Sequence, residues 1–181
     1  KCKLFNTFII TTPMYADIVY DYIDDKSITL IIMKTKTMSE TIKRCQFLSS
    51  VQSNFLMIMP DTYINDELNI NMINDMLKVE SDIVLCCWKI SNIQRGKLGQ
   101  CNIDENNNVI EIVDKDPNCT FEYAWGVMAW NHKYWDYIDS MTSHIGITLN
   151  NAITNGLKIK AIKMSGTYND CGTFLEYKSI L

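Results

Sequence analysis

The sequence predicts an open α/β fold with a β-rich portion in its second half. Apolar runs in the first half do not alternate with polar residues, and each is followed by a helix start. Such strands are typical of parallel sheets buried on both faces. From residue 98 the pattern changes to strands without intervening helices. The length of 181 residues, with 47% hydrophobic and 21% charged residues, fits one globular domain over 1–181.

The first half repeats a strand followed by a helix three times. Thr12 and Pro13 suit an N-cap and a first helical position, because proline needs no amide hydrogen there. Successive strands of this kind lie parallel with right-handed crossovers. We expect strands at residues 8–11, 27–33 and 55–60, each followed by a helix, the third over residues 66–78.

The second half combines a hairpin with the remaining strands and helices. The asparagine-rich turn "ENNN" separates two strand-like runs, which predicts a β-hairpin. Gly156 suits the C-cap of a late helix. We expect strands at 82–90, 98–104, 109–115, 123–130 and 158–164, and helices at 131–141 and 148–156.

Composition argues against several classes of partner. The net charge of −4 gives no basic footprint, so we expect no nucleic-acid partner. No apolar segment approaches the roughly 18 residues that a membrane span needs, and we expect no membrane partner and a cytoplasmic location. The seven cysteines contain no CxxC pair, which argues against a disulfide or zinc framework.

Two loop aspartates are candidate metal ligands. Asp61 follows the apolar run "FLMIMP", so it lies where a buried strand ends, and ligands of open α/β sheets bind at that edge. Asp170 follows the last strand, between Gly166 and Gly172. Two such carboxylates can converge on Mg²⁺, which one or two carboxylates and substrate phosphates typically hold. Aspartate is also common in turns for local reasons, so both interpretations stay open at this point.

The order of motifs resembles that of the sugar-1-phosphate nucleotidyltransferases, the family of glucose-1-phosphate thymidylyltransferase and related pyrophosphorylases. The matching segments cover nearly the whole chain and are "FIITTPMYADIVYDYI", "TKTMSETI", "MIMPDTYI", "RGKLGQCNIDENNNVIEIVDKDP", "YAWGVMAW" and "GTYNDCGTFLEY". The resemblance implies a three-layer α/β/α open mixed sheet, Rossmann-like and nucleotide-diphospho-sugar transferase-like, with a β-rich sugar-binding portion.

The resemblance also implies roles for particular residues. Asp61 and Asp170 would hold Mg²⁺ during nucleotidyl transfer from a nucleoside triphosphate to a sugar 1-phosphate, and Lys115 would contact the sugar phosphate. These three are the expected catalytic residues. Gly99, Asp114, Trp125 and Gly126, together with Lys115, would form the sugar site, although Trp125 is also a good core residue. Ser39 and Glu40 lie where the family approaches the nucleotide, although an N-cap and a capping box explain them as well.

The sequence departs from the family at its start. It begins at Lys1, near the family's second strand, and no glycine precedes Gly96, so the family's glycine-rich phosphate loop has no counterpart here. Pro60 replaces the glycine that usually precedes the first aspartate. We expect an N-terminally incomplete enzyme, whose sheet a further segment or a homo-oligomeric partner completes. A non-catalytic module that binds a nucleotide sugar is the alternative, and a glycosyltransferase of related topology ranks lowest because Asp61-Thr62-Tyr63 is not Asp-x-Asp.

Overall fold

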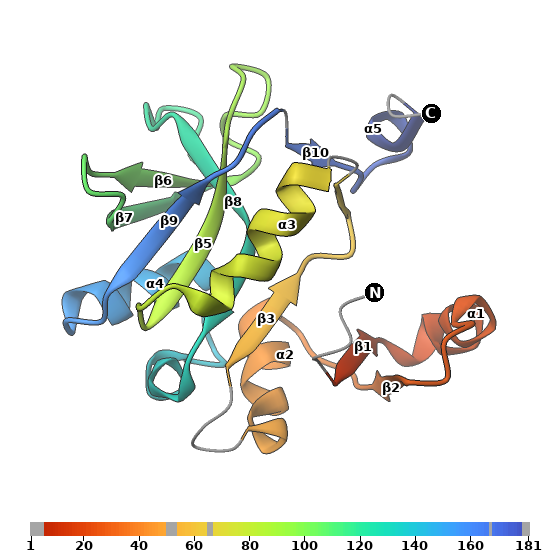
Figure 1. Ribbon diagram of the computed structural model, residues 1–181. Coiled ribbons are helices and arrows are strands. Elements are labelled where there is room, and N and C mark those ends of the chain that lie inside the picture. Colours follow the sequence, from red (N-terminus) through yellow and green to blue (C-terminus); the bar gives the residue numbers. More distant parts are fainter. Residues whose placement is uncertain (1–5, 50–53, 65–66, 167, 179–181) are drawn as a thin grey trace.

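The computed structural model describes residues 6–49, 54–64, 67–166 and 168–178. The first part of the chain forms, in order, β1 (Thr7–Thr11), η1 (Pro13–Tyr15), α1 (Ala16–Tyr22), β2 (Ile28–Ile32), α2 (Met38–Arg44), η2 (Cys45–Leu48), β3 (Phe55–Ile58), β4 (Thr62–Tyr63), α3 (Glu67–Asp75) and η3 (Met76–Lys78). The second part forms β5 (Ile83–Lys89), β6 (Gly99–Ile103), β7 (Val109–Asp114), β8 (Tyr123–Trp130), η4 (His132–Tyr137), α4 (Ile145–Thr154), β9 (Ile159–Lys163), β10 (Asn169–Asp170) and α5 (Phe174–Lys178). Figure 1 shows their arrangement.

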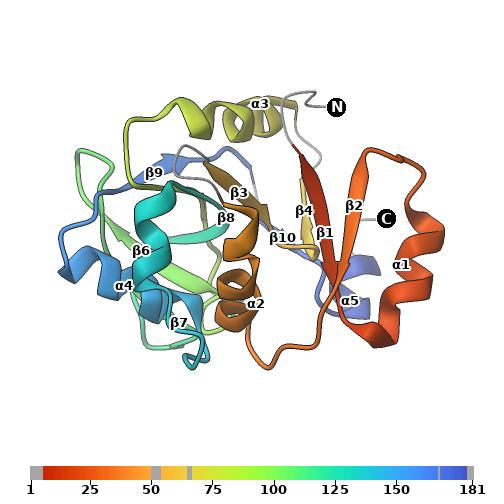
Figure 2. The same ribbon diagram turned by 90° about the horizontal axis from the view of Figure 1, so that it is seen from below.

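The main body has three layers around an open mixed sheet (Figures 1 and 2). The sheet has the order β7-β6-β8-β5-β9, and β3 also pairs with β8. Strand β9 is parallel to β5, whereas β8 is antiparallel to β3, β5 and β6. Apolar residues of α2 and α4 pack on one face, and those of α3 and η3 pack on the other. The predicted three-layer α/β/α sheet is therefore confirmed.

Strand β5 lies between β8 and β9 and is buried on both faces. Its six residues from Ile83 to Trp88 are all buried, which fits the continuous apolar run of the sequence. Cys86 and Cys87 are inside the core as small apolar residues. Between them the β5–β8 register shifts, so Cys86 pairs with Val127 and Cys87 with Trp125, and Gly126 has no partner in the β5 register.

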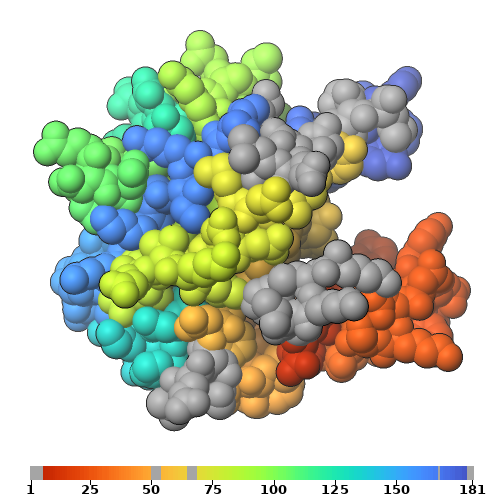
Figure 3. Space-filling view, in the orientation of Figure 1, coloured from red at the N-terminus to blue at the C-terminus, as the bar shows by residue number. Residues whose placement is uncertain are grey.

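The N-terminal unit of β1, η1, α1 and β2 departs from the expected continuous parallel sheet. Strands β1 and β2 are parallel, as predicted. Within the described residues, however, β1 pairs with β2 alone, and β3 pairs with β8 alone. The unit stands at one side of the main body in Figure 3. Its strands are only partly buried, and it exposes several large apolar side chains: Met14, Tyr15, Ile18, Tyr20, Tyr22 and Ile32.

Two predicted elements have a different form in the structure. The segment at 131–141 was expected to be an α-helix, but it contains the 3-10 helix η4, which Asn131 caps by accepting a hydrogen bond from the Lys133 amide. The buried ring of Trp135, in η4, packs edge-on against the rings of Phe55 and Trp130. The helix after Pro13 likewise begins with a 3-10 turn, and the Thr12 side chain makes no cap hydrogen bond there. Gly156 takes a φ of +87° just after α4, as its C-cap role requires.

Candidate functional site

Asp61 lies in a tight turn directly after β3. The Thr62 amide donates to the Met59 carbonyl over 3.1 Å, which places Pro60 and Asp61 at the two central positions of the turn. Proline is favoured at the first of these positions because its ring fixes φ. The Asp61 side chain is consequently carried out to the surface, where the residue is exposed.

A short antiparallel ladder brings Asp170 beside this turn. Strand β10 pairs with β4 so that Asp170 lies opposite Thr62, and the Cys171 amide donates to the Asp61 carbonyl over 2.7 Å. Residues more than a hundred positions apart in the chain thus become neighbours. The juxtaposition that the sequence predicted for Asp61 and Asp170 is present in the structure.

Gly172 shows how closely the two carboxylates approach each other. A Cβ atom at Gly172 would lie 3.0 Å from Asp170 Oδ1 and 3.5 Å from Asp61 Oδ2. The Gly172 amide also donates to Asp170 Oδ1 over 2.9 Å, which fixes the orientation of that carboxylate. Both carboxylates therefore border the same small volume, and a side chain at position 172 would fill it.

The two carboxylates of Asp61 and Asp170 suit Mg²⁺, whose remaining ligands can be waters and substrate phosphates, better than they suit a metal ion that needs all its ligands from the protein. Among the described residues, no group of three or more His, Cys, Asp or Glu side chains gathers as a ligand set. Mg²⁺ is commonly bound through one or two carboxylates, with waters and substrate phosphates as its other ligands. The Asp61 and Asp170 carboxylates can supply this number of ligands.

Asp114 and Lys115 end β7, at a second corner of the sheet. Asp114 lies opposite Gly99 in the β6–β7 register, and its Oδ2 accepts a 2.9 Å hydrogen bond from the Gly146 amide at the start of α4. Burial raises the pKa of Asp114, and the neighbouring His144, the Gly146 amide and Lys115 oppose that rise only in part. Lys115 is exposed and has a φ of 55°, a left-handed conformation that is uncommon for a non-glycine residue.

Trp125 and Gly99 adjoin the Asp114 carboxylate. A Cβ atom on Gly99 would lie 2.5 Å from both Asp114 Oδ1 and Trp125 Nε1, so a glycine is required at this position. The Trp125 ring belongs to the core, yet its buried Nε1 has no hydrogen-bond partner among the residues that the structure describes. The structure thus brings together Gly99, Asp114, Lys115 and Trp125, four of the five residues predicted for the sugar site.

Gly126 has a different neighbour. The space that its missing side chain leaves is occupied by the ring of Tyr168, because a Cβ on Gly126 would lie 2.9 Å from Tyr168 Cζ and 3.1 Å from Cδ2. Tyr168 is almost fully buried, and its hydroxyl shares a 2.8 Å hydrogen bond with Thr62 Oγ1. Sequence reasoning missed Tyr168 and Thr62, although each lies within two residues of a predicted metal ligand.

Ser39 and Glu40, the predicted nucleotide-binding residues, make the contacts of a helix start. Ser39 is fully buried, and its Oγ accepts a hydrogen bond from the Thr142 hydroxyl. The Glu40 amide donates to Thr37 Oγ1, as in a capping box, but the Glu40 carboxylate accepts from the Lys36 amide. Their role toward a nucleotide stays a prediction.

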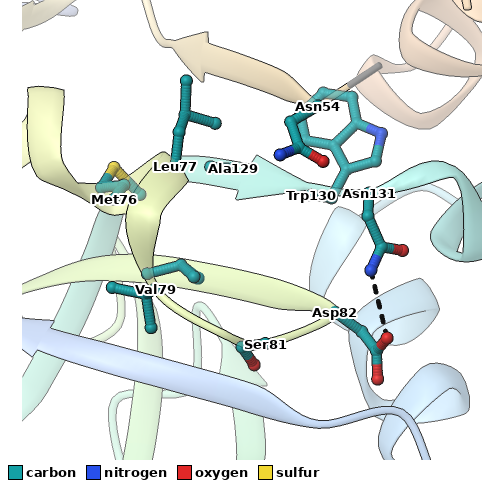
Figure 4. A pocket seen from close by; sticks show the side chains of 10 residues that line it. Asn54, Met76, Leu77, Val79, Ser81, Asp82, Ala129, Trp130 and Asn131 are labelled. Atoms are coloured by element: carbon teal, nitrogen blue, oxygen red, sulfur yellow. Dashed lines mark hydrogen bonds between the residues drawn. The ribbon is translucent and has the colours of Figure 1, made fainter. Parts of the chain in front are cut away.

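A small pocket lies elsewhere, between η3 and the ends of β5 and β8 (Figure 4). Asp82 lies at its rim and accepts hydrogen bonds from the side chains of Asn131 and Lys133. The residues that line the pocket include none of the predicted site residues.

None of the helices in the described part of the chain has the length and apolarity to cross a membrane.

The open mixed sheet has the fold of the sugar-phosphate nucleotidyltransferases. A protein from Bacillus anthracis described as a glucose-1-phosphate thymidylyltransferase has a TM-score of 0.78 and 19% identity, over 95% of this chain and 73% of that chain. A UDP-glucose pyrophosphorylase has a TM-score of 0.77 and 16% sequence identity, over 95% of this chain and 77% of that chain. The inositol-1-phosphate CTP transferase from T. maritima has a TM-score of 0.69 and 14% sequence identity, over 92% of this chain and 70% of that chain. No protein-family model and no curated protein sequence matches the chain. At these identities the likeness establishes the fold.

Proposed function

We propose that this protein transfers a nucleotidyl group from a nucleoside triphosphate to a sugar 1-phosphate, forming an NDP-sugar and pyrophosphate. The observation that carries the proposal is the convergence of the Asp61 and Asp170 carboxylates around Gly172. The names of the similar solved structures describe transfer to glucose 1-phosphate or inositol 1-phosphate, or refer to UDP-glucose, and so support this reaction class.

In the proposed reaction an oxygen of the sugar phosphate attacks the α-phosphorus of the triphosphate. A new phosphorus–oxygen bond forms while the bond from the α-phosphorus to the bridging oxygen breaks, and that electron pair leaves with pyrophosphate. Mg²⁺, when bound, neutralises phosphate charge. Asp61 and Asp170 contribute oxygens to one small volume, and the β4–β10 ladder holds them there before any substrate binds.

The sugar phosphate is the proposed ligand of the Asp114–Lys115 corner. The exposed ammonium group of Lys115 would attract the phosphate, and the unusual φ of this residue is a strain that a binding role would explain. Asp114 uses Oδ2 to accept from Gly146, while Oδ1 faces Gly99 and Trp125. Asp114 would therefore accept hydrogen bonds from sugar hydroxyls through Oδ1.

Pyrophosphate release by the purified protein tests the proposal. Each common nucleoside triphosphate is paired with glucose 1-phosphate, mannose 1-phosphate and further sugar 1-phosphates in the presence of Mg²⁺. At least one pair is expected to release pyrophosphate. Loss of one carboxylate in Asp61→Asn or Asp170→Asn removes part of a charge stabilisation worth several kcal/mol, so the rate falls by about 100-fold or more.

Asp75→Asn is the matched control, because Asp75 is an exposed carboxylate that pairs with Lys78 on the surface of α3 and η3. It is expected to keep the wild-type rate. Absence of release for every pair would refute the proposal. Binding of a nucleotide sugar without turnover would then support the alternative of a non-catalytic binding module.

A further inference from the structure

Tyr168 links the two halves of the proposed metal site to the core. It lies two residues before Asp170, and the residue to which its hydroxyl bonds, Thr62, follows Asp61 directly. The Tyr168–Thr62 hydrogen bond of 2.8 Å therefore joins the two segments that carry the carboxylates. The ladder itself consists of two residues on each strand, and the Tyr168–Thr62 bond adds a side-chain link beside it.

The surroundings of Tyr168 leave its ring little freedom. The ring packs between Gly126 and Trp88, with a ring-centroid distance of 5.3 Å to the latter. The Tyr168 carbonyl accepts a 2.8 Å hydrogen bond from Gln94 Nε2.

We propose that Tyr168 is a positioning residue for the metal site, which holds the Asp61 and Asp170 carboxylates at one separation through its wedged ring and its hydrogen bond to Thr62. This inference rests on the proposed function, since it concerns the same Mg²⁺ site that Asp61 and Asp170 are proposed to form. Groups that orient metal ligands commonly change metal affinity about 10- to 100-fold when they are removed. Tyr168 meets no phosphate or sugar in this role and acts through the two carboxylates.

Binding of Mn²⁺ alone to the complete protein, measured by electron paramagnetic resonance, tests this inference without any catalytic turnover. Mn²⁺ takes the same oxygen ligands and octahedral geometry as Mg²⁺. Tyr168→Phe keeps the ring and removes the hydroxyl, and Thr62→Val removes the other partner. Each variant is expected to weaken Mn²⁺ binding about tenfold. The double variant is expected to be no weaker than either single one, because both remove the same bond.

Tyr134→Phe is the matched control for the loss of a buried hydroxyl. The Tyr134 hydroxyl is buried and bonds to Thr148 Oγ1 over 2.5 Å, within the core on the α4 face of the sheet. This variant is expected to lose stability but to keep the wild-type Mn²⁺ affinity. A merely structural role of Tyr168 would give the same result as this control.

Two failures can be told apart with Asp61→Asn and Asp170→Asn. If these variants lose Mn²⁺ binding while Tyr168→Phe and Thr62→Val keep it, the positioning role is wrong and the metal site stands. If neither aspartate variant changes Mn²⁺ binding, the metal site is wrong, and the inference about Tyr168 is overturned with it.

Discussion

Gly126→Ala is a direct perturbation of the contact between β8 and Tyr168. The added methyl group would overlap the ring, at 2.9 Å from Cζ and 3.1 Å from Cδ2 and closer still to Cε2. Carbon atoms in contact are ordinarily about 3.5 to 4.0 Å apart. The ring would have to move away from β8, but Trp88 packs against it, and Tyr168 is almost fully buried.

The expected cost has two parts. Overpacking of a well-packed core by one methyl group typically costs about 1–3 kcal/mol. A displaced ring would also lose its hydrogen bond to Thr62, which contributes about 0.5–1.5 kcal/mol. We therefore expect Gly126→Ala to lower the free energy of unfolding by about 2–4 kcal/mol.

Urea unfolding of Gly126→Ala, followed by tryptophan fluorescence, measures this cost. The same substitution in a Tyr168→Ala background has no ring to meet, so we expect it to change the free energy of unfolding by less than about 0.5 kcal/mol relative to Tyr168→Ala alone. An equal cost of Gly126→Ala in both backgrounds would refute the steric explanation.

Three further substitutions test the metal site, the phosphate contact and the pH dependence of stability. Gly172→Ala should leave the urea midpoint nearly unchanged while weakening Mn²⁺ binding, because its methyl group fills the space between the two carboxylates. Lys115→Ala should raise the KM for the sugar 1-phosphate more than it lowers kcat, and an unchanged KM would contradict phosphate contact. Although burial opposes the charge of Asp82, hydrogen bonds from the Lys133 side chain, the Lys158 amide and the Asn131 side chain hold the pKa of this carboxyl below its usual value. Its stabilising contribution is therefore present above about pH 4 and is lost as the pH falls through the lower folded-state pKa, so the difference in unfolding free energy between wild type and Asp82→Asn should shrink from pH 7 to pH 3.

Local patterns predicted the parts of the fold that local physics determines. The apolar run that became β5 is buried along its length, and the asparagine-rich turn joins β6 and β7 as a hairpin. Gly156 follows α4 with the left-handed φ that only glycine adopts without strain. Hydrophobic periodicity and turn chemistry act over a few residues, so the sequence displays them directly.

Long-range contacts were harder to predict. The sequence suggested that Asp61 and Asp170 meet, since both follow strands that end at one edge of a sheet. It did not indicate that Tyr168 occupies the space of Gly126, because that contact joins residues 42 positions apart through a register shift in β8. The run of βα units did not indicate where the described strands β1 and β2 separate from β3, although the departure from the family pattern had led us to expect a sheet that another segment or partner completes.

Transfer of label from a nucleoside triphosphate tests the central claim most directly. With the active triphosphate and sugar 1-phosphate pair, an α-³²P label is expected in the sugar nucleotide and a γ-³²P label in pyrophosphate, and both transfers should require Mg²⁺ and fall by about 100-fold or more in Asp61→Asn. This result would place bond cleavage at the α-phosphorus, beside the two carboxylates. Appearance of the γ-³²P label on the sugar or in inorganic phosphate, or transfer at the wild-type rate in Asp61→Asn, would contradict the account.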